Sequence, residues 1–465
     1  MKRLILAALT ASALSCPALA QRAAPPMPAT VDPQVAQLRD AALKDDTAWD
    51  IIEGLTTEVG QRLAGTEAEA RARAWAVAKL TALGFKNVRV EPYRMPVWER
   101  GAETAEIIAP FPQKLTLAAL GNSGATPATG LTGEVVVFAN MAAFQAASDD
   151  AIKGKIVYIG NAMPRTQDGS GYGAYGTARF VGPALASRRG AAAIVIRSIG
   201  TDHHRFPHTG TTDFPAGVKP IPAAALSVPD AEQLERIALR GAPIRMKLVL
   251  TPRQVGMRES GNVIAEVPGS DPSAGIVLVG GHLDSWDLGT GAIDDASGIA
   301  ITTAAAKRIL DAGQPRRTIR VVWFGAEEVG GMGGAAYAKA HATERHATAS
   351  ESDFGADRVW RFEVNLPPAA QPVADRLQTA LAPLGITRGS GLGGDGTDIG
   401  PTLKLGTAAI DLNQSGWDYF DTHHTPDDVI DRIDPAALRQ NVAAWTAMLA
   451  VVANAPEAID AVKPR

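Results

Sequence analysis

The sequence predicts an α/β protein in which helices cover a mixed, mostly parallel sheet and a β-rich domain is inserted. Three observations support this prediction. Strand-like and helix-like segments alternate after Gly261, short strands with glycine-rich loops fill residues 124–250, and helical periodicity precedes both regions. The chain has 465 residues, which is more than one simple core requires.

The first twenty residues have the pattern of a signal peptide. Two basic residues precede an apolar run at residues 4–14, which is too short for a bilayer anchor, and a small-x-small pattern ends at Ala20. We expect cleavage after Ala20 and a secreted or periplasmic protein. Cleavage also removes Cys16, the one cysteine, and therefore excludes disulfides, thiolate zinc ligands and cysteine nucleophiles from the mature chain.

The charge balance argues against some classes of partner. The chain has 45 basic and 49 acidic residues, a formal charge of −4, and so lacks the basic surplus typical of nucleic-acid binding. We expect no nucleic acid and no membrane span, and the oligomeric state, including a homodimer, stays open.

The front of the chain predicts a flexible leader followed by helices and a strand. Residues 21–33 are rich in proline and alanine. Apolar residues recur at helical spacing from Asp46 to Gly84, and Gly84 ends the second helix. A strand follows at residues 88–91 and closes at Pro92. Residues 34–123 and 251–465 are expected to form one discontinuous domain.

Residues 124–250 predict a separate β-rich domain. Apolar strands are expected at residues 134–138, 155–159 and 191–196, between glycine-rich loops. His203, His204 and His208 have the look of a metal-binding tract. Because they occupy a Pro/Gly loop, a solvated loop is the favoured interpretation, with contact to substrate across the cleft as the alternative.

The second half alternates strands and helices. Strands are expected at residues 276–279 and 319–324, and helices at 296–312 and 333–342. Such alternation indicates a largely parallel sheet with its sites at the carboxyl ends of the strands.

The first two segments with chemical potential flank the first of these helices. His282 ends a strand, and Asp284 is placed to fix its tautomer or to border bridging solvent. Asp294 and Asp295 precede the helix, where its dipole stabilises negative charge. Asp295 as a helix cap beside a solvated Asp294 explains the pair, and so does a carboxylate that bridges two metals.

Acidic residues after the next strand supply further candidate ligands. Glu327 and Glu328 would repel each other without cations, and one could bind metal while the other acts as general base. Asp353 and His424 complete the set. Five ligands of the types His, Asp, Glu, Asp and His, one of them bridging, suit two zinc ions.

These motifs resemble a known family. Gly-Gly-His-Leu-Asp-Ser at 280–285, Asp-Asp-Ala-Ser-Gly at 294–298, Glu-Glu-Val-Gly at 327–330 and His-Thr-Pro-x-Asp at 424–428 are similar to those of co-catalytic di-zinc peptidases. That family includes secreted leucyl aminopeptidases and plasma glutamate carboxypeptidase. Residues 281–287 and 393–398 are most similar to the plasma glutamate carboxypeptidase branch, and the inserted region resembles a protease-associated domain.

The resemblance implies the zinc-exopeptidase fold and a role for each site residue. It makes Asp294 the bridging ligand, pairs His282 with Asp353 on one zinc, and pairs Glu328 with His424 on the other. It also makes Glu327 the general base and acid, with Asp284 behind the ligands. His424 is chosen over His423 because it directly precedes Thr-Pro-x-Asp.

The resulting expectation is a zinc-dependent exopeptidase that acts on short peptides or dipeptides, from a free amino terminus. Asp395 and Asp398, in a glycine loop, are candidates either for turn residues or for binding the substrate α-amino group. The alternatives are a carboxypeptidase acting on dipeptides, a catalytically silent peptide-binding protein and a one-zinc cyclase on the same fold.

Overall fold

The computed structural model describes residues 31–459 except 395, and residues 461–463. The expected signal peptide, most of the expected leader and Asp395 lie outside the described residues. Helix α1 (Pro33–Ala42) begins at the last residue of the expected leader, where the Asp32 side chain accepts a hydrogen bond from the Gln34 amide.

The described residues form two eight-stranded sheets. In spatial order, the first contains β1 (Lys86–Glu99), β10 (Arg253–Val267), β12 (Ile319–Phe324), β11 (Ile276–His282), β13 (His346–Glu351), β16 (Ala408–Gln414), β14 (Val359–Asn365) and β15 (Thr387–Arg388). The four strands β12, β11, β13 and β16 are parallel, and β10 and β14 flank them antiparallel. The predicted mixed, mostly parallel sheet is confirmed.

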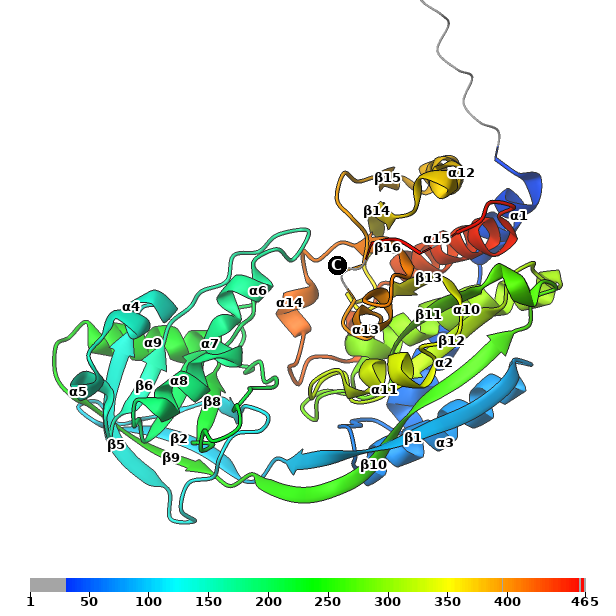
Figure 1. Ribbon diagram of the computed structural model, residues 1–465. Helices are drawn as coiled ribbons and strands as arrows, with labels where there is room; N and C mark the ends of the chain where they lie inside the picture. Colours follow the sequence, from blue (N-terminus) through cyan, green and yellow to red (C-terminus); the bar gives the residue numbers. More distant parts are fainter. Residues whose placement is uncertain (1–30, 395, 460, 464–465) are drawn as a thin grey trace, which may run out of the picture.

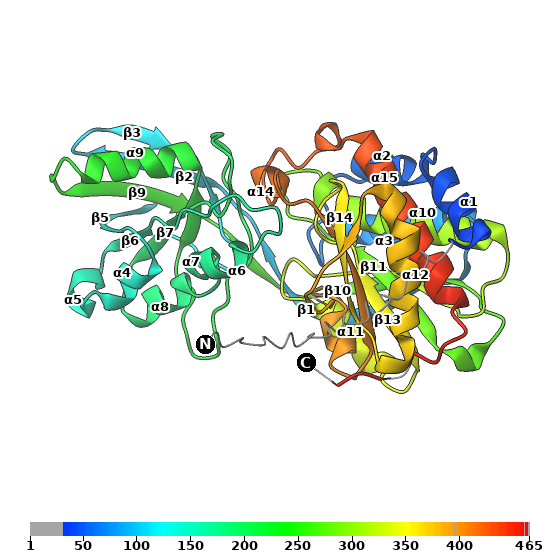
Figure 2. The same cartoon turned by 90° about the horizontal axis from the view of Figure 1, so that it is seen from above.

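Helices cover both faces of this first sheet. The larger face packs against α1, α2 (Thr47–Glu58), α3 (Glu67–Ala82), α10 (Ser297–Ala312), α12 (Gln371–Leu381) and α15 (Pro435–Asn454). The other face packs against α11 (Met332–Ala340) and α13 (Gly400–Leu403). Strand β12 shows the alternation, since Val321 and Trp323 face the first group and Val322 and Phe324 face the second. Figure 2 places α1, α10, α12 and α15 on the side away from the inserted domain.

Helix α15 is long and apolar enough to cross a membrane by length and composition. Within the described residues, however, 89% of its most apolar window is buried. It packs against α1, α10 and α12, and its composition is therefore that of a core helix.

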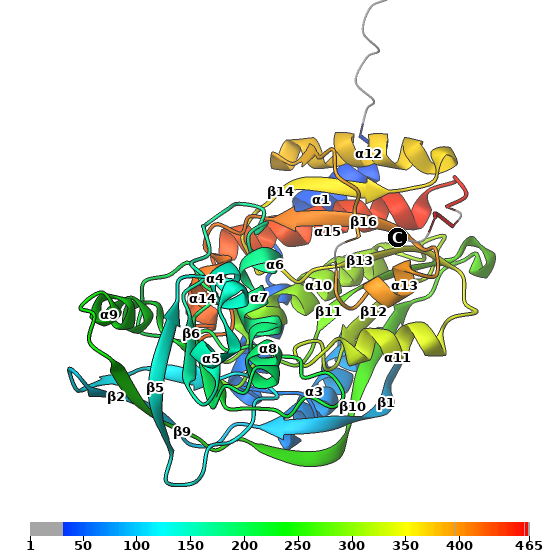
Figure 3. The same ribbon diagram turned by 60° about the vertical axis from the view of Figure 1, so that its left-hand side comes forward.

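The second sheet lies in the inserted domain. In spatial order it contains β3 (Gln113–Leu115), β2 (Glu103–Ala109), β9 (Ile244–Leu250), β5 (Leu131–Phe138), β6 (Ile156–Ile159), β7 (Ala193–Arg197), β8 (Ala223–Leu226) and β4 (Leu117–Ala119). The helices of this domain are α4 (Met141–Ala146), α5 (Asp149–Ile152), α6 (Tyr172–Tyr175), α7 (Thr177–Phe180), α8 (Gly182–Arg188) and α9 (Val228–Ala238). Figure 3 brings this domain forward.

Two boundaries differ from the sequence prediction. The inserted sheet begins at Glu103, not at residue 124, because β2 pairs with β9, the last strand of the domain in sequence. Strand β1 also continues past Pro92 to Glu99. Proline is tolerated there because β1 is an edge strand, where a missing N–H costs no ladder hydrogen bond.

Arg100 lies at the junction of the two domains, which Figure 1 shows joined through the continuous run of β1–β2 and β9–β10. Its guanidinium binds Asp287 through two hydrogen bonds of 2.8 Å and donates to Thr209 Oγ1 at 3.0 Å. It also donates to the Ala119 carbonyl at 2.6 Å. One largely buried cation therefore connects both domains.

We predict that Arg100→Gln lowers the free energy of unfolding by about 3–5 kcal/mol, because it leaves Asp287 without its cation in a largely buried site. Urea unfolding followed by tryptophan fluorescence measures the change. The matched control is Arg253→Gln, since the Arg253 side chain is 75% exposed beside Glu99 and should cost about 0–1 kcal/mol. Equal effects of the two variants would contradict the interpretation.

Candidate metal centre and active site

A cleft of about 850 Å³ lies between the two domains, at the carboxyl ends of the parallel strands. The inserted domain contributes Tyr172, Arg179 and Phe180 to its lining. The larger domain contributes a set of mostly ionisable side chains: Asp294, Glu327, Glu328, Glu351, Asp353, His423 and His424. The structure therefore brings five of the predicted groups together in one cleft, namely Asp294, Glu327, Glu328, Asp353 and His424.

His282 is the last residue of β11 and is fully buried. Its Nδ1 lies 2.9 Å from the Asp284 backbone carbonyl, which fixes that nitrogen as the donor. Its Nε2 faces Asp294 Oδ1 at 3.0 Å and Asp353 Oδ1 at 3.5 Å. Asp284 thus sets the tautomer, as its position in the sequence predicts, and it does so through its backbone carbonyl, since its carboxylate lies 3.8 Å away.

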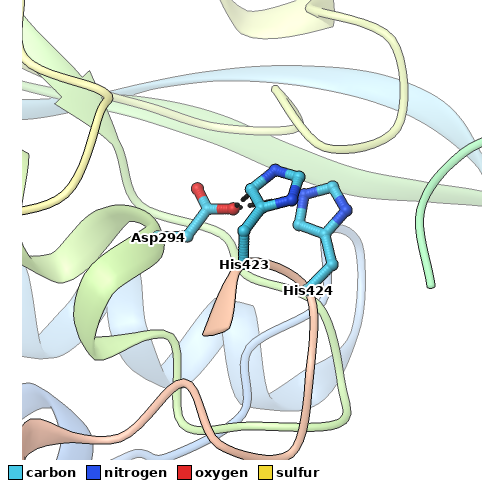
Figure 4. A group of neighbouring side chains, drawn as sticks. All are labelled: Asp294, His423 and His424. Atoms are coloured by element: carbon cyan, nitrogen blue, oxygen red, sulfur yellow. Dashed lines mark ion pairs between the residues drawn. The ribbon is translucent and has the colours of Figure 1, made fainter. Parts of the chain in front are cut away.

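The Asp294 carboxylate lies between two imidazoles. Its Oδ1 faces His282, and its Oδ2 lies 3.1 Å from His424 Nε2 (Figure 4). Asp428 also holds this segment. Its carboxylate accepts a hydrogen bond from the Ile293 amide at 2.6 Å and from the Asp294 amide at 3.3 Å. A carboxylate with one oxygen toward each of two ligand groups has the arrangement of a bridging ligand.

His424 also faces Glu328. Its Nε2 lies 3.0 Å from Glu328 Oε2, and its Nδ1 lies 3.3 Å from the Thr209 carbonyl of the inserted domain. His423 stacks on it with ring centroids 3.5 Å apart, and its Nε2 is 3.5 Å from Asp294 Oδ2. His424 therefore contacts both carboxylates of this half of the site, while His423 lies beside them.

The backbone around these groups is unusual. His424 has φ +61° and Ala326, directly before Glu327, has φ +59°. A non-glycine residue in this left-handed region costs roughly 1–3 kcal/mol and persists only where its surroundings hold it. Strain is thus located at two of the loops that supply site residues.

Asp295 supports the centre without facing the cleft. It caps α10 by accepting from Gly298 N at 2.9 Å, and it accepts from His282 N at 3.1 Å. A Cβ on Gly281 would lie 2.1 Å from Asp295 Oδ2, and one on Gly298 would lie 2.3 Å from Oδ1. The glycines of both motifs are therefore required for this carboxylate to fit.

Glu327 lines the cleft after β12, and its backbone N–H donates to Asp284 Oδ1 at 3.1 Å. Burial, together with the charges of Asp294 and Asp284, raises the pKa of Glu327. A raised carboxyl pKa suits a group that exchanges protons near neutral pH.

The site contains more carboxyl groups than two imidazoles can neutralise. Burial and the neighbouring Asp294 charge raise the pKa of Glu328 well above its ordinary value. Burial raises the pKa of Asp353 to about 7, although 20% of its side chain stays exposed. For Asp294, burial is outweighed by hydrogen bonds from His282 and His424, which hold its pKa well below its usual range. Cations would relieve this excess of negative charge.

The structure does not support a substrate contact for Asp398. Its side chain is fully buried and does not line the cleft. Glu351, a neighbour of Asp398, does line the cleft. Its carboxylate accepts hydrogen bonds from the amides of Asp398 and Ile399 at 3.0 and 2.9 Å. Burial raises the pKa of Glu351 to about 8. The sequence prediction did not include Glu351. Its position two residues before the predicted ligand Asp353 is the signal that could have identified it.

Sequence reasoning missed three further residues. Arg62 is fully buried and donates to the carbonyls of Thr290 and Gly291 at 2.6 and 2.8 Å, which holds the loop before Asp294. Arg179 lies 3.3 Å from His424 Nδ1. Asp428 is the final residue of the His-Thr-Pro-x-Asp pattern, which is the signal that identifies it.

The histidine tract divides into two parts. His203 and His204 are exposed, as a solvated loop predicts. His208 is 1% exposed, so the prediction is wrong for this residue, which contacts the larger domain through the His423 carbonyl.

The donor set fits zinc. His282, Asp294 and Asp353 can offer atoms within 4.8 Å of one another, as can Asp294, His423 and His424. Glu328 Oε1 is buried without a hydrogen-bond partner in the described structure, which is costly unless a cation binds there. Nitrogen and oxygen donors at a buried site are the ligands that zinc uses in hydrolases.

Comparison with known proteins agrees with this geometry. Residues 262–449 match the model of peptidase family M28. The crystal structure of a peptidase M28 precursor from Shewanella amazonensis is similar, with 44% identity, a TM-score of 0.89, and coverage of 93% of this chain and 98% of that one. A zinc aminopeptidase from Bacillus subtilis, at 21% identity and TM-score 0.64, covers 90% of this chain and 98% of its own and shares the fold.

Curated relatives extend the match over most of the sequence. Carboxypeptidase Q of Bos taurus is 35% identical over 406 residues, which are 87% of this chain and 84% of the relative. The human protein of that name is 34% identical over the same length. The chain therefore belongs to peptidase family M28, the zinc exopeptidases, and is a metallopeptidase.

Proposed function

We propose that the protein is a two-zinc exopeptidase that hydrolyses short peptides or dipeptides. His282 and Asp353 would hold one ion, and Glu328 and His424 would hold the other. Asp294 would be a ligand of both ions. The observation that carries this proposal is the Asp294 carboxylate, whose two oxygens face His282 at 3.0 Å and His424 at 3.1 Å. When bound, zinc would polarise the scissile carbonyl and favour deprotonation of the attacking water.

Glu327 is the proposed proton carrier. Its carboxylate accepts a proton from the attacking water and returns it to the leaving amine as the C–N bond breaks. Asp284 holds the Glu327 amide and so orients the loop that presents this carboxylate. Tyr172, Phe354 and Phe420, all in the lining, provide apolar walls that limit water in the cleft.

Charge in the cleft bears on which substrate terminus is bound. Glu351 and Asp353 form an acidic wall that suits a free α-ammonium group, which favours attack from the amino terminus. Arg179 and Arg361 also line the cleft and suit a free carboxylate. That observation, with the name of the carboxypeptidase Q relatives, makes a carboxypeptidase acting on dipeptides the second candidate.

We also propose export to the periplasm or the medium. This proposal rests on the signal-peptide pattern that ends at Ala20. The inserted domain would act as a protease-associated domain that narrows access to the cleft, in keeping with short peptides as substrates.

We predict that Asp294→Ala weakens both metal sites, because each would lose the shared ligand. Elemental analysis after dialysis should find two zinc ions in the wild type and fewer than one in the variant. Asp311→Ala is the control, since Asp311 is an exposed aspartate of helix α10. Two retained ions in Asp294→Ala would exclude the bridging role.

We predict that Glu327→Gln keeps both ions and loses on the order of 10²–10⁴ in kcat, because the amide keeps the size and cannot accept the proton. Steady-state kinetics and zinc analysis of one preparation measure both quantities. Turnover near that of the wild type would remove Glu327 from the mechanism.

We predict that acetylation of the amino terminus abolishes cleavage of a dipeptide, whereas amidation of its carboxyl end is tolerated. The acidic wall at Glu351 is the reason, since acetylation removes the charge that it would bind. Chromatographic assay of the four blocked and unblocked peptides gives the answer. Loss of cleavage on amidation alone would assign the enzyme to the carboxypeptidase candidate.

A further inference from the structure

A segment of the inserted domain, residues 201–209, is bound to the loop that carries His423 and His424. We name it the docking segment. The Thr201 amide donates to the Phe420 carbonyl at 3.0 Å, and the Thr209 amide donates to the His424 carbonyl at 3.1 Å. Figures 1 and 2 show α14 (Tyr419–Thr422), which precedes the two histidines, lying against the inserted domain.

His208 makes a second buried contact of this segment with the histidine loop. Its Nδ1 lies 2.7 Å from the His423 carbonyl and its Nε2 lies 2.6 Å from Asp202 Oδ1. Its backbone amide donates to Ser198 Oγ at 2.8 Å. A Cβ on Gly200 would lie 2.2 Å from Nε2, so the ring fits here only because residue 200 is glycine. The imidazole is therefore fixed in position.

The two carbonyls held by the docking segment flank the strained residue. His208 binds the carbonyl of His423, and Thr209 binds that of His424, whose φ is +61°. This backbone conformation directs His424 Nε2 toward Asp294 and Glu328. Groups of the inserted domain thus support the geometry of one half of the site.

The other half has its own support within the larger domain. The Asp284 carbonyl lies 2.9 Å from His282 Nδ1, and the Asp295 carboxylate accepts from the His282 amide at 3.1 Å. Ser352, next to Asp353, is bonded through its side chain to Gln414 at 2.9 Å. Loss of the docking contact should therefore affect the two halves unequally.

We propose that His208 is a positioning residue that completes the Glu328–His424 zinc site from the inserted domain. It acts through the His423 carbonyl, which keeps His424 in its left-handed conformation. This inference rests on the proposed two-zinc function and adds a role for the inserted domain in metal binding.

Two substitutions separate the two ring contacts. The amide nitrogen of asparagine lies two bonds from Cβ, as Nδ1 does, so His208→Asn keeps a donor for the His423 carbonyl. The amide nitrogen of glutamine lies three bonds from Cβ, as Nε2 does, so His208→Gln keeps the Asp202 contact and loses the other. His203→Ala is the matched control, because His203 is an exposed histidine of the same segment.

The experiment is a zinc titration of apo full-length protein against a chromophoric chelator, with unfolding temperatures of the apo forms measured in parallel. We expect His208→Gln to bind one of its two ions about 10–100-fold more weakly, the usual effect of losing a group that orients a ligand. His208→Asn and His203→Ala should keep both affinities. Asp202→Asn, which leaves His208 in place but weakens its orientation, should show a smaller loss at the same single site and serves if His208→Gln does not fold.

The outcomes are distinguishable. Weakening of one ion in His208→Gln, with rescue in His208→Asn, supports the proposal. Wild-type affinity for both ions in His208→Gln overturns it, and so does equal weakening of both. For Asp202→Asn, unchanged affinity of both ions overturns it in the same way. A wild type that binds a single zinc overturns the two-zinc function itself, and this inference with it.

Discussion

The position of the Asp294 carboxylate is the constraint on which the rest of the site depends. Its two oxygens face His282, at the end of β11, and His424, which follows β16 much later in the sequence. Asp428 accepts hydrogen bonds from the amides of Ile293 and Asp294, and Arg62 donates to the carbonyls of Thr290 and Gly291 just before them. These contacts are buried or partly buried, and they help to keep an ionised group in a place that it would otherwise leave for water.

The sheet supplies the second constraint. His282, Glu328 and Asp353 follow β11, β12 and β13, which are adjacent and parallel, so their carboxyl ends present these ligands along one edge. His424 follows the next strand, β16, by way of α14. Close approach of four carboxylates to two imidazoles is unfavourable without cations, and the sheet imposes that approach. The fold thus builds a site whose charge is balanced by metal.

The inserted domain does more than cover the cleft. Tyr172, Arg179 and Phe180 line it, and Thr209 lies against the backbone and ring of His424. Arg100 connects the two domains at the same junction, where it binds Asp287 of the larger domain and the side chain of Thr209. The same interface therefore lines the cleft and contacts His424. The position of the inserted domain thus bears on both the access to the site and its geometry.

The sequence by itself determined the sheet class, the helix over residues 297–312, strand β12 and the identity of the clustered groups, because periodicity and strand-end position are local signals. It did not locate the domain boundary at Glu103, since the pairing that puts β2 in the inserted sheet is with β9, about 140 residues later in the sequence. It also could not find Arg62, Arg179 or His208 as supports of the site. Their partners lie 228, 245 and 215 residues away, and no local pattern records a contact of that separation. Tertiary packing alone decided that a histidine from a Pro/Gly loop is buried against the backbone of His423, because the desolvation of its ring is compensated there by two hydrogen bonds.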